Sequence, residues 1–360
     1  MLQQTRRYLI CIVFGLTMVI ATSCVDTENE SYAPEKTTSP QTLLDEKIEY
    51  YRYLYPEIVF LILNGDDELP ADMIALDQVL GYQPKSMDYE HPAELREDLM
   101  FVSVGRVELM LQSKMPSSSL FKTDTPLSQQ EYICVLTINL YDMAADSIRS
   151  TQHLLELPQK VIQKIPKDLL LPPGDYLAFV IDHEIYHCLK SMYVGPQLMS
   201  HKKLWGEYNI FHNELGADAY ALGMHIKTRD EDSIFAKNIM RIRGMALYNG
   251  DPDHLTCKAL EQVLKIPSNN IAEMSAYEVF DMANRIKDRL TTDYDEYIRH
   301  LASKVQAMKE LGVEEQISEE FLNKIKGIPA DPKEVKALVA NARRCSSDLC
   351  GNEFEQGKCE

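Results

Sequence analysis

One apolar segment with ionisable residues inside it constrains this 360-residue chain more than any other feature. The segment follows a Pro-Pro-Gly break at residues 172–174 and reads YLAFVIDHEIYHCLKSMY over residues 176–193. Its length and apolar content predict a helix of about 18 residues. The Asp, His and Glu side chains within it are conspicuous, because such groups are rarely buried without partners.

Two histidines in this segment are spaced to bind one metal ion. His183 and His187 are four positions apart, which places them on one face of an α-helix, and neutral imidazole is a good zinc ligand. Glu184 is offset by roughly 100° around the helix axis, which can place its carboxylate beside a metal-bound water as a general base. The alternative is a core helix with two hydrogen-bonded histidines.

A second segment downstream carries two acidic residues at the same spacing. A helix is expected from about Trp205 to Ile226, with apolar residues on the faces that pack into the core. Glu214 and Asp218 share another face of this helix, and Glu214 is far enough from His187 for a turn and an antiparallel return. The alternative for this acidic pair is an ordinary solvated helix face.

Together, the HExxH and NExxxD patterns of these two segments resemble the gluzincin zinc metallopeptidases, the group that includes thermolysin-like enzymes. The resemblance implies three ligands for Zn²⁺: His183, His187 and Glu214. It also implies Glu184 as the catalytic general base and proton shuttle. Asp218 would be the hydrogen-bond acceptor that orients His183.

The resemblance covers about 45 residues and implies features around the site. Ala217 stands where the thermolysin-like pattern often has Ser, but no metal bond depends on that position. In such a fold an extended peptide lies along an edge strand, and we expect residues 131–142, a short run rich in β-formers, to form it. The alternative is a central strand of a small sheet. An oxyanion stabiliser is also implied. Four candidates lie beyond the third ligand: Tyr220, His225, Tyr248 and His254.

The first 23 residues resemble a bacterial lipoprotein signal peptide. A basic start precedes an apolar run at residues 9–21, too short to span a bilayer as an ordinary helix, and small residues then lead to Cys24. We expect cleavage before Cys24 and lipidation of its thiol; a plain signal peptide cleaved nearby is the alternative. Residues 24–41 are predicted to be a flexible tether. The expected location is the bacterial cell envelope, lipid-anchored at the outer membrane, on its periplasmic or surface face.

The rest of the pattern predicts a mostly helical α+β fold. Helices are expected at residues 42–63 and 92–113, and over most of the chain after residue 229. Ser275 and Glu278 match the capping-box pattern of a helix N-terminus. In residues 331–334, Asp331 is expected to cap a helix whose first turn contains Pro332 and Glu334. The tyrosines within residues 50–55 are expected to pack helices, and Arg241 and Arg243 to form surface ion pairs.

This organisation predicts three parts after the tether. A zincin-like metallopeptidase domain with a small sheet is expected at residues 42–228. A helical C-terminal region at residues 229–344 packs on it, and a Cys-containing tail occupies residues 345–360.

The cysteines allow several pairings. Six remain after Cys24, so fifteen pairings exist, and an envelope location permits disulfides. Cys345 and Cys350 are close enough for a local disulfide, with two free thiols as the alternative. The absence of a CxxC pair argues against a sulfur-based zinc site.

The net charge excludes some classes of function. With 37 Lys and Arg against 55 Asp and Glu, the chain carries a net charge of −18. An acidic surface repels phosphate, so we expect no nucleic-acid partner and membrane contact only through the N-terminal lipid. The predicted activity is hydrolysis of a peptide or protein substrate by zinc-activated water. The alternative is a catalytically inactive metal- or peptide-binding envelope lipoprotein.

Overall fold

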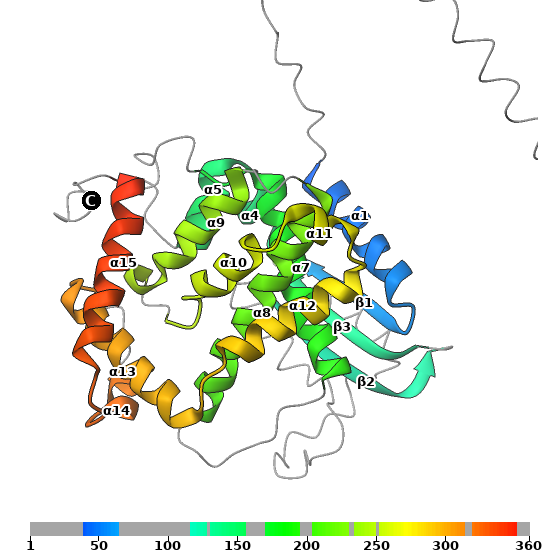
Figure 1. The fold of residues 1–360 in the computed structure, drawn as a ribbon. Helices are drawn as coiled ribbons and strands as arrows, with labels where there is room; N and C mark the ends of the chain where they lie inside the picture. The colour runs from blue at the N-terminus through cyan, green and yellow to red at the C-terminus, as the bar shows by residue number, and fades with distance from the viewer. Residues whose placement is uncertain are drawn as a thin grey trace, which may run out of the picture. The chain divides into compact units, whose positions relative to one another are not determined.

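The computed structural model describes residues 39–64, 116–127, 130–155, 170–194, 204–229, 234–249, 252–313 and 319–350. Residues from Thr38 to Glu360 belong to one compact unit, which is mostly helical with a small mixed sheet (Figure 1). This confirms the predicted α+β class. The predicted signal peptide, Cys24, nearly all of the tether and the 92–113 helix lie outside the described residues.

Among the described residues, the sheet has three strands in the order β1-β3-β2. β1 (Ile58–Asn64) is parallel to β3 (Gln130–Ile138), and β2 (Ser117–Leu127) is antiparallel to it. The expectation that residues 131–142 form an edge strand is therefore wrong, because β3 lies between the other two strands. The edge strand that packs against α7 is β2. The continuous run of buried residues in β3 is typical of a strand covered on both faces.

The predicted helix over residues 42–63 is wrong in its second half. α1 (Pro40–Leu54) begins after Ser39, whose side chain accepts a hydrogen bond from the amide of Thr42. The helix ends at Leu54, just before the Tyr55-Pro56 step, because a residue that precedes proline is disfavoured in the α conformation. The β-branched run that follows then pairs with β3 as β1.

Two helices form the centre of the fold. α7 (Pro173–Tyr193) and α8 (Trp205–Thr228) correspond to the two predicted segments and pack against each other. α1 and the sheet, through its strand β2, pack against α7. On the other helix, α12 (Ala276–Leu290) packs along α8 (Figure 1). Glycines allow these close approaches: a Cβ on Gly216 would lie 2.0 Å from the hydroxyl of Tyr186, and one on Gly223 would lie 2.7 Å from Val279.

A buried ion pair attaches α1 to α7. The ammonium of Lys47 lies 2.6 and 2.8 Å from the carboxylate oxygens of Asp182, and the hydroxyl of Tyr51 donates to the same carboxylate at 2.7 Å. Burial raises the pKa of Asp182, and the charge of Lys47 partly offsets that rise. Tyr51 and Tyr55 are buried as expected for packing, whereas Tyr53 is 84% exposed.

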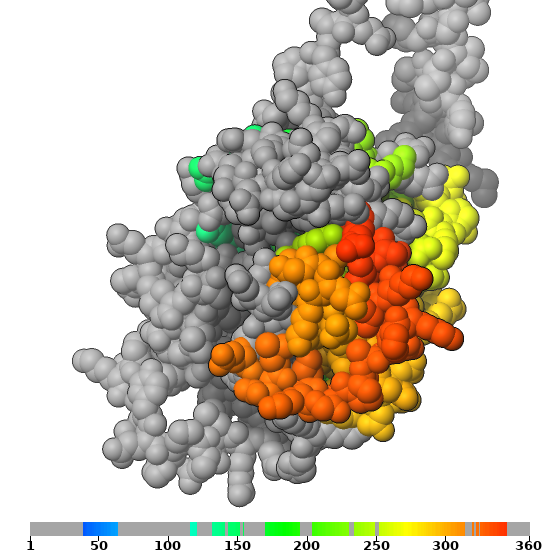
Figure 2. Space-filling view, turned by 90° about the vertical axis from the view of Figure 1, so that its left-hand side faces the viewer, coloured from blue at the N-terminus to red at the C-terminus, as the bar shows by residue number. Residues whose placement is uncertain are grey.

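Shorter helices and a C-terminal group complete the fold. The remaining elements are α4 (Leu140–Ala144), α5 (Ser147–Leu155), α9 (Ile234–Gly244), the 3₁₀ helix η4 (Ala246–Asn249), α10 (Cys257–Leu264), α11 (Ser268–Glu273), α13 (Tyr294–Glu310), α14 (Glu319–Ile325) and α15 (Pro332–Cys350). A second hydrophobic cluster holds α13 to α14 and α15, and Figure 2 shows these orange and red segments together on one face. Within the described ranges, no helix combines the length and apolar character needed to cross a bilayer.

Both predicted capping patterns are present. The amide of Glu278 donates to the hydroxyl of Ser275, and the carboxylate of Glu278 accepts from the amide of Ser275, which completes the capping box of α12. At α15, the carboxylate of Asp331 accepts from the amide of Lys333 at 2.9 Å. The helix itself begins at Pro332, as the sequence predicts.

One disulfide joins the sheet to α7. Cys134 of β3 and Cys188 of α7 are bonded, with their Cα atoms 5.9 Å apart, and both residues are fully buried. The side chains of Cys345 and Cys350 lie outside the described part of the chain, so the predicted local disulfide is untested.

Candidate metal centre

Three side chains from α7 and α8 converge. Nε2 of His183 lies 3.3 Å from Nε2 of His187 and 2.9 Å from Oε2 of Glu214. The other oxygen of Glu214, Oε1, lies 3.4 Å from Nε2 of His187. Two ring nitrogens and a carboxylate thus face a common point, and this group could hold a metal ion. The structure therefore brings together the three ligands that the sequence predicted.

The remaining ring nitrogen of His183 is held by Asp218. Nδ1 of His183 lies 2.8 Å from Oδ1 of Asp218, so the N–H at Nδ1 donates to this carboxylate. That tautomer turns the Nε2 atom toward Glu214 and His187. A carboxylate behind a histidine fixes its ring orientation and raises its basicity, which is the predicted role of Asp218.

Asp218 is in turn held by residues that the sequence did not single out for this role. Nε and one terminal nitrogen of Arg243 lie 2.8 and 3.0 Å from the two Asp218 oxygens, and the hydroxyl of Thr256 also donates to Asp218. Arg243 is buried, so its expected surface ion pair is wrong; its neighbour Arg241 is half-buried. Sequence reasoning missed this contact because no local pattern links residues 218, 243 and 256.

The charges around the cluster favour a bound cation. Burial alone would lower the pKa of His183, but the charge of Glu214 and the hydrogen bond to Asp218 outweigh it and raise this pKa to about 9. Burial would raise the pKa of Glu214, but the neighbouring histidines hold it well below its ordinary value. Burial and the charge of His183 lower the pKa of His187 despite the attraction of Glu214. An anionic Glu214 and a neutral His187 are the protonation states that metal ligands require, whereas His183 would release its Nε2 proton on binding a metal ion.

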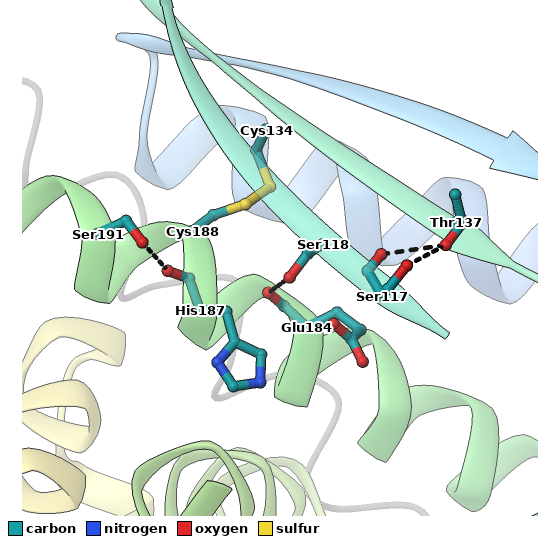
Figure 3. The surroundings of a disulfide bond; sticks show 8 residues. All are labelled: Ser117, Ser118, Cys134, Thr137, Glu184, His187, Cys188 and Ser191. Carbon is teal, nitrogen blue, oxygen red and sulfur yellow. Dashed lines mark hydrogen bonds between the residues drawn. A yellow bond between two sulfur atoms is a disulfide. The ribbon is translucent and has the colours of Figure 1, made fainter. Parts of the chain in front are cut away.

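Glu184 lies close enough to His187 for its charge to act on that histidine, and its side chain is buried. Its backbone carbonyl accepts a hydrogen bond from the hydroxyl of Ser118 of β2 at 2.7 Å, which ties the strand to α7 (Figure 3). Among the described residues, no hydrogen bond or salt bridge involves the Glu184 carboxylate.

The disulfide lies on the opposite side of α7 from the cluster. In Figure 3 the sulfur of Cys188 points to the sheet, whereas the ring of the adjacent His187 points to α8. The backbone carbonyl of His187 also accepts from the hydroxyl of Ser191 at 2.8 Å. The disulfide thus anchors the turn of α7 that carries His187 to the central strand of the sheet.

Of the four oxyanion candidates, the structure brings one to the cluster. Nε2 of His254 lies 3.2 Å from Oε2 of Glu214, and its side chain is 31% exposed. The other three lie elsewhere. Tyr220 is buried, with its hydroxyl 3.2 Å from that of Tyr51. The ring centroids of His225 and Phe235 are 4.7 Å apart. Tyr248 belongs to the main hydrophobic core.

Comparison of the chain with protein families, with curated proteins and with solved structures finds no match.

Proposed function

We propose that this protein is a zinc-dependent peptidase of the gluzincin type, with a zincin-like catalytic domain. The single observation that carries the proposal is the convergence of His183, His187 and Glu214, with Glu184 beside them and Asp218 behind the first histidine. This convergence is what the combined HExxH and NExxxD patterns imply, and it supports the proposal.

Zinc is the metal that best fits the donor set. Two imidazole nitrogens and one carboxylate, with room for a fourth ligand, are typical of catalytic zinc sites. Donors at about 2.0–2.1 Å from one tetrahedral ion lie roughly 3.3 Å from each other. The Nε2 atoms of His183 and His187 are 3.3 Å apart, which fits that spacing, and each lies within 3.4 Å of one of the two Glu214 carboxylate oxygens.

The chain supplies the remaining groups for hydrolysis. Bound zinc would supply Lewis acidity and lower the pKa of a coordinated water. Glu184 accepts the proton of the attacking water and passes it to the leaving amine. His254, whose Nε2 lies 3.2 Å from Oε2 of Glu214, would donate a hydrogen bond to the oxygen on which negative charge develops. The outer edge of β2, the end strand of the described sheet next to α7, is where an extended peptide would lie.

We also propose that the mature protein is exported and anchored by a lipid on Cys24. Residues 9–21 and the small residues before Cys24 support this proposal. The disulfide between Cys134 and Cys188 supports it independently, because disulfides persist in oxidising compartments such as the periplasm and the cell surface.

The test compares the mature domain with its Glu184→Gln variant. Zinc content and hydrolysis of a mixed peptide library are measured for both, with Glu310→Gln, an exposed change on α13, as the control. We expect one zinc per chain in all three, activity in the wild type and control, and a loss of at least about 10²-fold for Glu184→Gln, the lower end of what general-base catalysis contributes. Bound zinc without hydrolysis of any peptide would favour the inactive binding lipoprotein instead.

A further inference from the structure

The segment that carries His254 supplies two side chains to the metal centre without being part of a helix. Residues 252–256, which we call the 252–256 turn, immediately precede α10. His254 of this turn lies beside Glu214, and Thr256 donates to Asp218. Within the turn, the amide of Thr256 donates to the carbonyl of His254 at 2.8 Å. The position of His254 therefore depends on what holds the turn in place.

Lys304 of α13 contacts the start of this turn. Its ammonium donates a hydrogen bond to the carbonyl of Pro252 at 2.9 Å and lies 3.6 Å from the centre of the Phe211 ring. Lys304 is only 5% exposed, although lysine is almost never buried without partners. A buried ammonium is stabilised by a carbonyl dipole and by the face of an aromatic ring, and both contacts have directional requirements.

These contacts connect three parts of the chain that are distant in sequence. Phe211 is on α8, just before the metal ligand Glu214, and Pro252 is two residues before His254. Because the ammonium is desolvated, it cannot leave the Pro252 carbonyl without losing a hydrogen bond that water does not replace. Movement of the turn away from Glu214 would break this contact.

We propose that Lys304 is a positioning residue that holds the 252–256 turn, and with it His254, against the metal centre. α13 is then part of the catalytic apparatus rather than a separate packing element. The inference rests on the proposed peptidase function for its catalytic consequence, but the contact itself can be tested without activity.

The first experiment measures backbone hydrogen exchange in the 252–256 turn and the start of α10. Lys304→Met keeps the length and apolar part of the side chain but removes the donor, and Lys309→Met removes an exposed lysine from the same helix. We expect at least a tenfold faster exchange of these amides in Lys304→Met and no change in Lys309→Met. Equal exchange in the two variants would overturn the inference, whatever the activity.

The second experiment is a double-mutant cycle on peptide hydrolysis. We expect Lys304→Met to lower kcat by about 10-fold to 10²-fold, up to the loss in His254→Ala, with zinc content unchanged. The double variant, Lys304→Met with His254→Ala, should lose no more kcat than His254→Ala alone, because both changes remove the same contribution of His254. Fully additive losses would contradict the proposed role, and Lys304→Arg, which keeps a donor, should recover part of kcat.

Two further outcomes keep the inference distinct from the proposed function. If Lys304→Met does not fold, Phe211→Leu, which removes the ring under the ammonium but not the donor, takes its place and should increase exchange of the turn in the same direction. If the wild-type chain hydrolyses no peptide, the proposed function fails, and the exchange comparison alone decides whether Lys304 holds the turn.

Discussion

Arg243 and Asp218 form a buried ion pair in which two guanidinium nitrogens contact both carboxylate oxygens, at 2.8 and 3.0 Å. The same carboxylate accepts the hydrogen bond from Nδ1 of His183. The orientation of a candidate metal ligand on α7 therefore depends on an arginine of α9, through an acid of α8.

Replacement of Arg243 is expected to weaken metal binding and destabilise the fold. Arg243→Met leaves the carboxylate of Asp218 buried without its main counter-charge, which costs about 3–5 kcal/mol in the free energy of unfolding. Loss of an outer partner of this kind typically weakens metal affinity about 10–100-fold. Urea unfolding and zinc competition titrations measure the two effects. Arg241→Met, on the same helix but half-buried, is the control, and equal effects in the two variants would contradict the role of Arg243.

Chelation of a metal ion bound at the candidate cluster is expected to lower the stability of the protein. A ligand that binds only the folded chain stabilises it by about 2.7 kcal/mol at 100 times its dissociation constant. Thermal unfolding with and without a chelator measures this difference. Glu214→Gln should abolish the dependence on chelator, because it removes the anionic ligand. A midpoint that does not respond to added zinc in the wild type would argue against a metal at this cluster.

Gly216 is expected to be essential for the contact between α7 and α8. A Cβ there would lie 2.0 Å from the hydroxyl oxygen of Tyr186 and 2.4 Å from the adjacent ring carbon, and that hydroxyl also donates to Asn284 of α12. Gly216→Ala should therefore destabilise the protein by about 1–3 kcal/mol. Gly206→Ala on the same helix, where no atom lies within 4 Å of the new Cβ, should be neutral or stabilising by up to about 1 kcal/mol. Equal effects at the two glycines would contradict the close approach.

The disulfide is expected to contribute substantially to stability. Cys134 and Cys188 are separated by 54 residues, and closing a loop of that length in the unfolded chain is worth about 4 kcal/mol in the chain-entropy treatment. Replacing both cysteines with Ala should lower the free energy of unfolding by about that amount. Cys257→Ser, which changes a cysteine outside this disulfide, is the control. If the double variant were as stable as this control, the two thiols would not be bonded in the native protein.

The ion pair between His300 of α13 and Glu334 of α15 is expected to make the free energy of unfolding depend on pH. The hydrogen bond to Glu334 raises the pKa of His300 above 6.5, so its contribution is complete below pH 6.5 and is lost as the pH rises through the raised value. Burial would raise the pKa of Glu334, but the bond to His300 lowers it below 4.5, so its contribution is complete above pH 4.5 and is lost on acidification. The pair should therefore stabilise most between about pH 4.5 and 6.5.

The contribution of this pair to the free energy of unfolding is small because both side chains are partly exposed. We expect His300→Gln to cost no more than about 1 kcal/mol within the window and less at pH 8. Urea unfolding at several pH values gives the profile. Glu334→Gln should give a similar profile and Glu310→Gln a flat one; a cost for His300→Gln that increases toward pH 8 would contradict the assignment.

The sequence alone determined the local parts of this protein. The four-residue spacing of His183 and His187, and that of Glu214 and Asp218, sets each pair on one face of its helix because an α-helix repeats every 3.6 residues. The capping box at Ser275 and the cap at Asp331 are equally local, since each joins residues within one turn. For this reason the shared face of each pair and the ends of these helices could be predicted from local spacing, whereas the convergence of the two pairs at one candidate metal site was implied only by the resemblance of the combined pattern to a known family.

Only the tertiary structure decided which distant residues meet. Arg243, Thr256 and His254 reach the metal centre from α9, from the start of α10 and from the turn before it, and no periodicity in the sequence relates them to α7. The central place of β3, the pairing of Cys134 with Cys188 and the change from helix to strand after Leu54 depend on the partners available in space. Side-chain periodicity encodes the faces of single elements, whereas contacts between elements are set by how those faces pack together in the folded chain.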